Sequence, residues 1–433
     1  MIDRLSQVKE LEVIARTSVM TYKKKEKKAA EIGRELKAGT LVEGSVRKSG
    51  NKIRVTIQLI DATTEGHLWS SRYDRNLEDI FVVQTDIAEK VADALKVQLL
   101  PNEVKAIAKH STSNSDAYLL YLKGRHYWNE RSKDSLIKAI RQFELAIEKD
   151  STFALAYVGL SDSYTVLADY EYVPPADSLP KAKEYATKAL KLDETLPEAH
   201  ASLAIVLYEL WELDAAEREF KRAIDLNPSY ASAHQWYGEF LWSTKRDSEH
   251  MIAEKLKARE LDPLSPAANV NVGVGYYATR QYDRAVDEFR KTVESFPDSF
   301  GARLWLAAGF LAKGRFEEAL TEIDKAALPG ADEIRLKMNR AVALALWGKT
   351  DEAMALIEEM KALSKVRFVS PIELAVVHAA VGQTDEAFRW LNKGCDEQYY
   401  SQIDSVFYRT IFSDRLGADP RWGEVLRKLK LTS

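Results

Sequence analysis

Two stretches of the chain repeat one pattern of apolar and polar positions. Glu212–Pro228 reads ELDAAEREFKRAIDLNP, and Gln281–Pro297 reads QYDRAVDEFRKTVESFP. In both, a small residue is followed four positions later by a large apolar one, which places the two on one face of a helix. The small residue recurs at intervals of 34 positions, at Ala182 and Ala216 and again at Ala285, Ala319, Ala353 and Ala387. This spacing predicts a repeated structural unit.

Each unit is expected to contain two short antiparallel helices. A glycine that can close the first helix stands five residues before the repeated alanine at Gly314, Gly348 and Gly382. A proline ends the second helix near Pro228, Pro263 and Pro297. Small residues that let the two helices approach closely recur at Ala204, Gly238, Gly273 and Ala307. One such hairpin cannot offset the cost of ordering its backbone, so stacked neighbours must supply the remaining contacts.

A helix–turn–helix unit of this length and pattern resembles the tetratricopeptide repeat. In 266–297 the family positions are occupied by Val272, Gly273, Tyr276, Ala285, Phe289, Thr292 and Pro297. We count eight units between Ala117 and Gly394; the second carries an insertion within LADYEYVPPADSLP, and the fourth has Met251 and Lys255 where the family has a small residue and an aromatic one. The resemblance implies a mainly α protein, a right-handed α–α superhelix whose concave face binds a protein or peptide.

In this family the inner face comes mainly from the first helix of each unit. Those positions give a candidate peptide-binding groove made of Tyr118, Tyr121, Arg125, Trp128, Asp162, Tyr208, Gln235, Glu239, Trp242 and Tyr277. Rings flanked by a few polar groups suit an extended peptide or a partner helix. The alternative for each ring is packing between repeats. The Lys and Asn of the family's carboxylate clamps do not occupy these positions, so a chaperone-tail ligand is not expected.

From the sixth unit onward the equivalent positions are apolar: Leu304, Ala308, Leu311, Val342, Leu346, Ile372, Val376 and Ala379. An apolar surface of this kind needs a cover. Either a partner provides it or the C-terminal segment YRTIFSDRLGADPRWGEVLRKLKL folds onto it, and we expect the second because terminal repeats require a cap.

The first hundred residues follow a different pattern. LEVIARTSV predicts a strand, EKKAAEIGRELK a helix that ends before Gly39, and GHLWSSRYDR a further strand. TLVEGSVRKSGNKIRVTIQLID predicts a hairpin that turns at Gly50-Asn51, because apolar and polar residues alternate after the turn. LEDIFVVQTDIAEKVADALKVQL predicts an amphipathic helix.

This region resembles the small α/β domain of the TolB amino-terminal and FlgO-like families. The segments that carry the resemblance are VIARTSV, EIGRELKAGTLVEGSVRKSGNKIRVTIQLIDATTEGHLWSSRYDR and DIFVVQTDIAEKV. The resemblance implies a sheet of three or four strands with helices in residues 1–108, a linker at 109–116, repeats at 117–397 and capping helices at 398–433. Related domains precede tetratricopeptide repeats in bacterial proteins that begin with a nucleotide cyclase, a Ser/Thr kinase or a winged-helix domain. The family's first strand is missing before MIDRLSQV, so either Met1 is not the natural start or the sheet has an open edge for a partner strand or a second copy of the chain.

Charge and cysteine content argue against several classes of protein and of site. The net charge of −4 and pI of about 6.1 argue against a generally basic protein that coats nucleic acid. The charge is uneven, +4 over residues 1–110 and −8 beyond, and the lysine run YKKKEKK is expected to be a solvated loop. A single cysteine, Cys395, excludes an internal disulfide and a multi-cysteine metal site. No apolar run reaches membrane-span length, so a cytoplasmic protein is expected, or a periplasmic one if it is part of a longer, membrane-anchored chain.

Two motifs that could indicate chemistry are better explained by packing. GVGYYA at Gly273–Ala278 fits the dinucleotide pattern G-x-G-x-x-A but lies within a repeat helix with no strand before it. His200 and His234 stand 34 residues apart in equivalent packing positions, with no convergent ligand set for a metal. We therefore expect no cofactor, no metal and no catalytic site. The predicted function is non-enzymatic protein binding; the alternative is a sensory or scaffolding part of a larger signalling protein.

Overall fold

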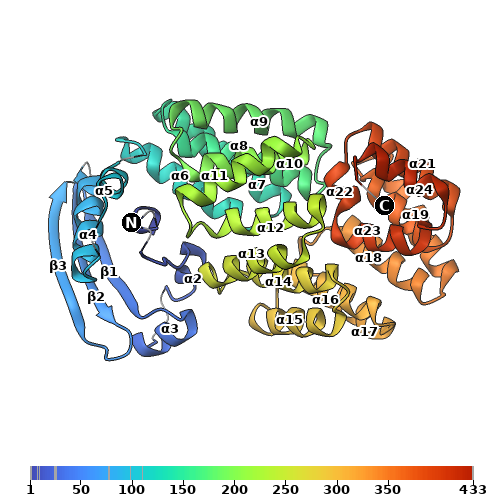
Figure 1. Cartoon of the computed structure of the whole chain (residues 1–433), viewed down its shortest axis with the longest axis horizontal. Coiled ribbons are helices and arrows are strands. Elements are labelled where there is room, and N and C mark those ends of the chain that lie inside the picture. Colours follow the sequence, from blue (N-terminus) through green and yellow to red (C-terminus); the bar gives the residue numbers. More distant parts are fainter. Residues whose placement is uncertain are drawn as a thin grey trace.

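The computed structural model describes residues 2–6, 8, 10–23, 27–76, 79–97, 99–109 and 111–431. A small sheet with its helices lies at one end of the molecule, a curved array of paired helices follows, and the C-terminal helices pack at the other end (Figure 1). The predicted fold, a helical-repeat superhelix preceded by a small α/β unit, is confirmed.

The sheet contains three antiparallel strands in the order β1 (Thr40–Ser49), β2 (Lys52–Asp61) and β3 (His67–Asn76). Ser49 pairs with Lys52, so the first hairpin turns at Gly50-Asn51 as predicted, and Gly50 has a φ of 57°, which favours glycine. The alternation predicted for the second strand is also confirmed, because one set of its side chains is buried: Ile53, Val55, Ile57 and Leu59.

The helices of this end are α1 (Ile2–Leu5), α2 (Arg16–Met20), α3 (Ala29–Leu36), α4 (Ile80–Ala94) and α5 (Pro101–Ala108). The amphipathic helix α4 contributes Val83, Ile87 and Val91 to one apolar cluster with the buried side chains of β2. Of the lysine run YKKKEKK, residues 24–26 lie outside the described residues, and Lys27 forms an ion pair with Glu35 at 2.6 Å.

The strand predicted at LEVIARTSV is wrong. Residues 11–15 form no regular element and α2 begins at Arg16. The backbone of this segment bonds to the array instead of the sheet: the Ala15 amide donates to the Leu261 carbonyl at 2.8 Å. Ser18 donates to Asp262 Oδ1 from its amide at 3.1 Å and from its hydroxyl at 2.5 Å. An extended apolar segment has the same sequence pattern whether its partner is a strand or a distant loop.

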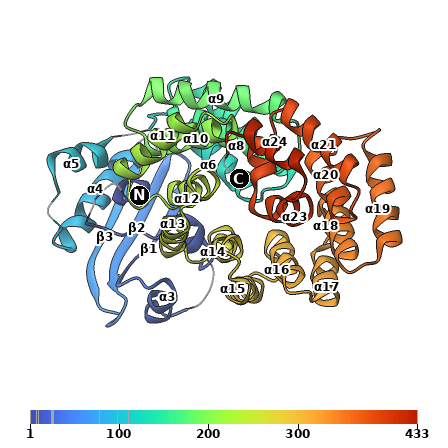
Figure 2. The same cartoon turned by 45° about the vertical axis from the view of Figure 1, so that its right-hand side comes forward.

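Sixteen helices form eight antiparallel hairpins in the described part of the array (Figure 2). The first helices of the hairpins are α6 (Ser115–Asn129), α8 (Ala154–Asp169), α10 (Pro197–Glu209), α12 (Ala231–Lys245), α14 (Pro266–Ala278), α16 (Phe300–Ala312), α18 (Glu333–Leu346) and α20 (Pro371–Ala380). The second helices are α7 (Lys133–Lys149), α9 (Pro175–Leu192), α11 (Leu213–Leu226), α13 (Ser248–Leu261), α15 (Tyr282–Ser295), α17 (Phe316–Ala326), α19 (Thr350–Leu363) and α21 (Thr384–Asp396).

Glycines in the first helices make room for aromatic rings of the second helices. Phe143 of α7 is fully buried, and a Cβ on Gly124 of α6 or on Gly159 of α8 would lie 2.5 Å from its ring. A Cβ on Gly273 would lie 2.4 Å from the buried ring of Phe289. The GVGYYA motif is therefore the interior of α14, and its glycines serve helix packing.

In the third and fourth hairpins, a histidine ties the start of the hairpin to its second helix. His200 Nε2 bonds to the Glu194 carbonyl at 2.9 Å and Nδ1 to Glu219 at 2.6 Å. His234 bonds in the same way to Pro228 and Glu254. At the same position of later repeats, Asn269 and Arg303 likewise donate to the carbonyl six residues earlier. The two histidines are thus hydrogen-bonded structural groups.

The turns between the first hairpins carry the N-terminal region. The residue that follows each of α7, α9, α11 and α13 is polar, and each of the four bonds to a residue that precedes α6, in the N-terminal domain or in the linker after it. The pairs are Thr112 with Asp150, Lys109 with Asp193, Ser6 with Asn227, and Ser18 with Asp262. The sheet domain is therefore fixed along four consecutive turns, which we call the turn row.

The C-terminal helices are α22 (Tyr400–Asp404), α23 (Val406–Leu416) and α24 (Pro420–Lys428). Helix α23 packs against α20 and α14, next to the inner positions that the sequence showed to be apolar, which are buried except for the half-buried Leu346. The insertion of the second repeat reaches across the array, where Glu171 accepts hydrogen bonds from Arg335 (2.9 Å), Ser370 (2.7 Å) and Tyr408 (3.0 Å). The insertion thus joins the second hairpin to the last two.

Candidate binding site on the inner face

Three of the predicted groove residues meet where α6, α8 and α10 face the inside of the curve. Arg125 Nη1 lies 2.8 Å from Asp162 Oδ2, and the Ser202 hydroxyl donates to the other carboxylate oxygen. Asp162 is fully buried, and a buried carboxylate needs a cation and hydrogen bonds of this kind. The arrangement holds the Arg125 side chain in one position at the inner face.

Trp128 is the centre of this site. The guanidinium of Arg125 lies 4.1 Å from its ring centre and that of Arg131 lies 3.4 Å away, both in the range of cation–π contacts. The indole is 4% exposed, and its Nε1 has no hydrogen-bond acceptor in the described structure. A buried donor without an acceptor is uncommon and calls for an explanation.

Arg131 was missed by the sequence reasoning because it lies in the turn after α6, outside the repeated helical positions. Its φ of 58° is in the left-handed region, which residues other than glycine seldom adopt. Within the described residues it forms no ion pair with a carboxylate, so its donors are not neutralised by a salt bridge. The sequence feature that could have identified Arg131 is its position, three residues after a tryptophan predicted to lie on the inner face.

Carboxylates from three helices lie near this cluster. Desolvation inside the curve, followed by repulsion from Glu239, raises the pKa of Asp169 to about 6, although the residue itself remains exposed. Burial raises the pKa of Glu209 to about 8, with repulsion from Asp169 and Glu239 adding to it. Their charge on this part of the inner face therefore changes between pH 6 and pH 8.

The fourth repeat departs from the repeat pattern, and this departure gives Glu239 an ion-pair partner. Lys255 occupies the position of an aromatic ring and is 1% exposed at its side chain. Its ammonium group lies 3.1 Å from Glu239 and 3.0 Å from the Asn271 side-chain oxygen. A buried ammonium needs such acceptors, so Glu239 has a structural partner as well as a place on the inner face.

Four other predicted rings are packed between helices. The Tyr208 hydroxyl donates to Ser243 at 2.7 Å, and Tyr277 meets Trp305 edge-on at 5.7 Å; both tyrosines are 3% exposed. Tyr118 contacts Phe81 of α4, and Tyr121 contacts Phe153. Gln235 and Trp242 are half-buried, and the Trp242 Nε1 has no acceptor in the described structure. The ten predicted residues therefore divide into three that meet around Trp128, four packed tyrosines, and three half-buried residues of α12 (Gln235, Glu239 and Trp242), and their role in binding stays a prediction.

The C-terminal segment occupies the next part of the inner face. The Ser401 hydroxyl and the Gln402 amide donate to Glu209 at 2.5 Å and 3.0 Å. Asp404 accepts a hydrogen bond from Arg246 at 2.8 Å and another from Arg409. Helix α22 thus lies beside the site around Trp128.

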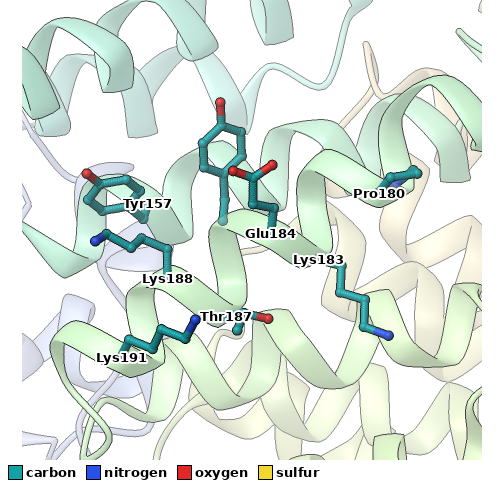
Figure 3. Close-up of a pocket in the computed structure, with 8 residues that line it drawn as sticks. Tyr157, Pro180, Lys183, Glu184, Thr187, Lys188 and Lys191 are labelled. Carbon is teal, nitrogen blue, oxygen red and sulfur yellow. The ribbon is translucent and has the colours of Figure 1, made fainter.

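A depression on the outside of the array, over α8 and α9, offers a weaker alternative (Figure 3). It is lined by Tyr157, Pro180, Lys183, Glu184, Tyr185, Thr187, Lys188 and Lys191. Most of these side chains stand along one exposed face of α9 and do not converge on an enclosed space (Figure 3). This surface carries charge but no set of groups for catalysis or for enclosing a ligand.

The described ranges contain no group of three or more His, Cys, Asp and Glu side chains that could hold a metal ion. Burial raises the pKa of Cys395 to about 11, so its sulfur is a thiol and a poor nucleophile at neutral pH. No described helix combines the length and the apolar character needed to cross a bilayer.

Residues 202–266 and 272–333 match the family model described as a tetratricopeptide repeat. Putative adenylate cyclase 3 of Rhizobium meliloti (strain 1021) is 35% identical over 218 residues, 49% of this chain and 36% of the cyclase. Transcriptional regulator HilA of Salmonella typhimurium (strain LT2) is 29% identical over 180 residues, 40% of this chain and 32% of HilA. The chain thus matches about a third of the length of these curated relatives.

Among solved structures, PilF of Pseudomonas aeruginosa covers 48% of this chain with 93% of its own length, at 22% identity and a TM-score of 0.36. The direct match is the one to the family model, and it falls on hairpins whose glycine, alanine and aromatic positions contact one another as the repeat pattern predicts. On that match, residues 202–266 and 272–333 are tetratricopeptide repeats, and hairpins of the same kind recur along the rest of the array.

Proposed function

We propose that this protein binds a peptide segment of a partner protein on the inner face of its first four repeats, and that it acts by binding and not by catalysis. The observation that carries the proposal is Trp128, a buried indole whose ring contacts the guanidinium groups of Arg125 and Arg131. Among the described residues, its N–H has no acceptor and Arg131 has no carboxylate partner. A ligand that supplies the missing acceptor would satisfy both donors.

The surrounding charges indicate which segment would fit. An acidic side chain or a carbonyl group suits the donors of Arg131 and the Trp128 Nε1. Asp169, near Arg131 and exposed, suits a cation elsewhere on the same segment. The preferred ligand is therefore a peptide with an acidic and a basic residue. This is a different chemistry from the Lys and Asn clamps of other repeat proteins.

Fluorescein-labelled dodecapeptides test the proposal. Sets that differ at one central position (Asp, Glu, Gln, Ala, Lys) are screened by fluorescence anisotropy against the whole chain. Acidic peptides should bind, and Arg131→Gln should weaken them at least tenfold. Arg141→Gln is the matched control, because Arg141 is an exposed arginine whose ion pairs, within the described structure, are with Glu144 and Glu148 of its own helix. Equal binding by the two variants would remove Arg131 from the site, and equal binding of all peptides would refute the charge preference.

A second candidate function rests on the comparisons. The matched relatives are named as a cyclase and a transcriptional regulator, and each is about three times as long as the matched part. The chain would then be a sensory or scaffolding part of a larger signalling protein. An immunoblot of source cells with an antibody to the repeats tests this. A band near 49.0 kDa would refute it, and a much larger band would support it.

A further inference from the structure

The stretch 399–408 lies on the inner face as a bound peptide would. Its aromatic side chains meet tryptophans of the array: Tyr400 contacts Trp211 at 6.1 Å between ring centres, and Phe407 contacts Trp305 at 6.3 Å. Its polar side chains meet charged ones, Ser401 and Gln402 on Glu209 and Asp404 on Arg246. The array therefore recognises this segment through rings and charges, the two means by which helical grooves bind peptides.

The fit of this segment is incomplete. Three of its polar atoms are buried without a hydrogen-bond partner in the described structure: Tyr399 Oη, Gln402 Oε1 and Asp404 Oδ2. Each unsatisfied buried polar atom opposes burial of the segment, because water would bond to it in the open state. Three such atoms in six residues are an unusual concentration, since native proteins contain only a few per hundred residues.

The carboxylates at this contact add to the same effect. Burial raises the pKa of Asp404 above its usual range in spite of its two arginines, and burial raises that of Glu209 to about 8. Both groups therefore lose hydration that their partners replace only in part. The contact between the C-terminal segment and the array is therefore made by specific side chains, but the desolvation of these carboxylates opposes it.

We propose that the inner face formed by Glu209, Trp211, Arg246 and Trp305 is a second binding surface, for helical segments that combine aromatic residues with an acidic one, and that α22 and α23 occupy it as a displaceable internal ligand. A partner segment that satisfies the orphaned atoms replaces them. The surface adjoins the site around Trp128, with which it shares the carboxylate of Glu209, but it does not depend on the peptide proposed there.

The test uses the full chain and one defined probe, a fluorescein-labelled peptide with the sequence of residues 398–416. Asp404→Asn keeps the shape of the side chain but removes the charge that holds Arg246 and Arg409. Hydrogen exchange across residues 400–416 should accelerate at least tenfold, because breaking a buried charge pair is strongly destabilising. Asp414→Asn, on the following helix α23, is the matched control. Its pair with Arg280 is exposed at both partners and contributes little.

Peptide binding then decides whether the surface accepts a ligand from outside. The labelled peptide should bind saturably to the Asp404→Asn chain and at least tenfold more weakly to the wild type, whose own segment competes at a high effective concentration. A scrambled peptide should bind to neither. If Asp404→Asn fails to fold, Tyr400→Ala, which removes the ring contact with Trp211 and leaves the ion pairs of Asp404 in place, replaces it. Exchange in 400–416 as slow as in the core helix α14, or no saturable binding to the loosened chain, would overturn the proposal.

Discussion

Gly273 tests whether close helix approach builds each repeat. A Cβ at this position would lie 2.4, 2.6 and 3.0 Å from three ring atoms of Phe289, which is fully buried and cannot move aside. Forcing an extra methyl group into a filled core costs about 1–3 kcal/mol, and contacts this short indicate the upper part of that range. Replacing a helical glycine by alanine returns about 1 kcal/mol. Gly273→Ala should therefore lower the free energy of unfolding by about 1–2 kcal/mol.

Gly301 supplies the matched control. It also lies within a helix, α16, but nothing lies within 4 Å of its Cβ position. Gly301→Ala should therefore raise the stability by about 0.5–1 kcal/mol. If the ring contact is the cause, glycine-to-alanine substitution changes the free energy of unfolding in opposite directions at the two sites.

Urea unfolding followed by circular dichroism and by tryptophan fluorescence measures both variants. The two probes are needed because repeat arrays can unfold in more than one step. A double-mutant cycle with Phe289→Leu then isolates the contact, since a smaller side chain should relieve the clash and give a coupling of about 1 kcal/mol or more. Stabilisation by Gly273→Ala, equal to that by Gly301→Ala, would refute the reasoning.

Two further predictions concern the groove and the turn row. The native pKa of Glu209, about 8, exceeds the value of 4.5 expected in the unfolded chain, so its contribution to stability is full below pH 4.5 and is lost as pH rises through 8. Glu209→Gln should flatten this decline in urea midpoints measured from pH 5 to 8.5, whereas Glu212→Gln at the surface should not. Asp262→Ala removes the acceptor of the N-terminal segment, so limited trypsin digestion after Arg16 should accelerate several-fold, whereas Asp298→Ala in the next turn should not change it.

An unchanged result in either variant would contradict the corresponding prediction. An unchanged pH slope in Glu209→Gln would mean that the carboxylate is already ionised and solvated in the native state. An unchanged cleavage rate in Asp262→Ala would mean that apolar contacts, and not the bonds to the turn, hold the segment in place.

Repetition made the array predictable from sequence. The same packing of a small residue against an aromatic ring recurs at Gly124, Gly159 and Gly273, and the 34-residue spacing of the small position marks the hairpins. The β1–β2 hairpin was predictable for a related reason, because its alternation and its Gly50 turn are local features. In each case the residues that decide the structure lie close together in sequence or repeat at a constant interval.

Contacts between distant residues set the limit of the prediction. The segment predicted as a strand takes its partners 244 residues away, at Asp262, and no local pattern encodes that choice. The insertion of the second repeat looks like a surface loop until Glu171 meets Arg335, 164 residues further on. The burial of Glu209 depends on a C-terminal segment that only the closed array brings near it. The sequence thus predicted the surface on which the candidate site lies. It did not predict that the C-terminal segment packs onto that surface, nor which donor groups of the described structure lack an acceptor.

The turn row has a mechanical consequence. Curvature in a repeat array is the sum of small rotations between neighbouring hairpins, and each rotation changes the distance between successive turns. Four of these turns are fastened to the N-terminal region, so a rotation between any two of the first four hairpins stretches or breaks a contact. The fifth turn carries Phe296 in place of a polar residue, and the fastening ends there. The turn row therefore resists rotation among the first four hairpins, whereas the later hairpins are tied back to the second one through Glu171.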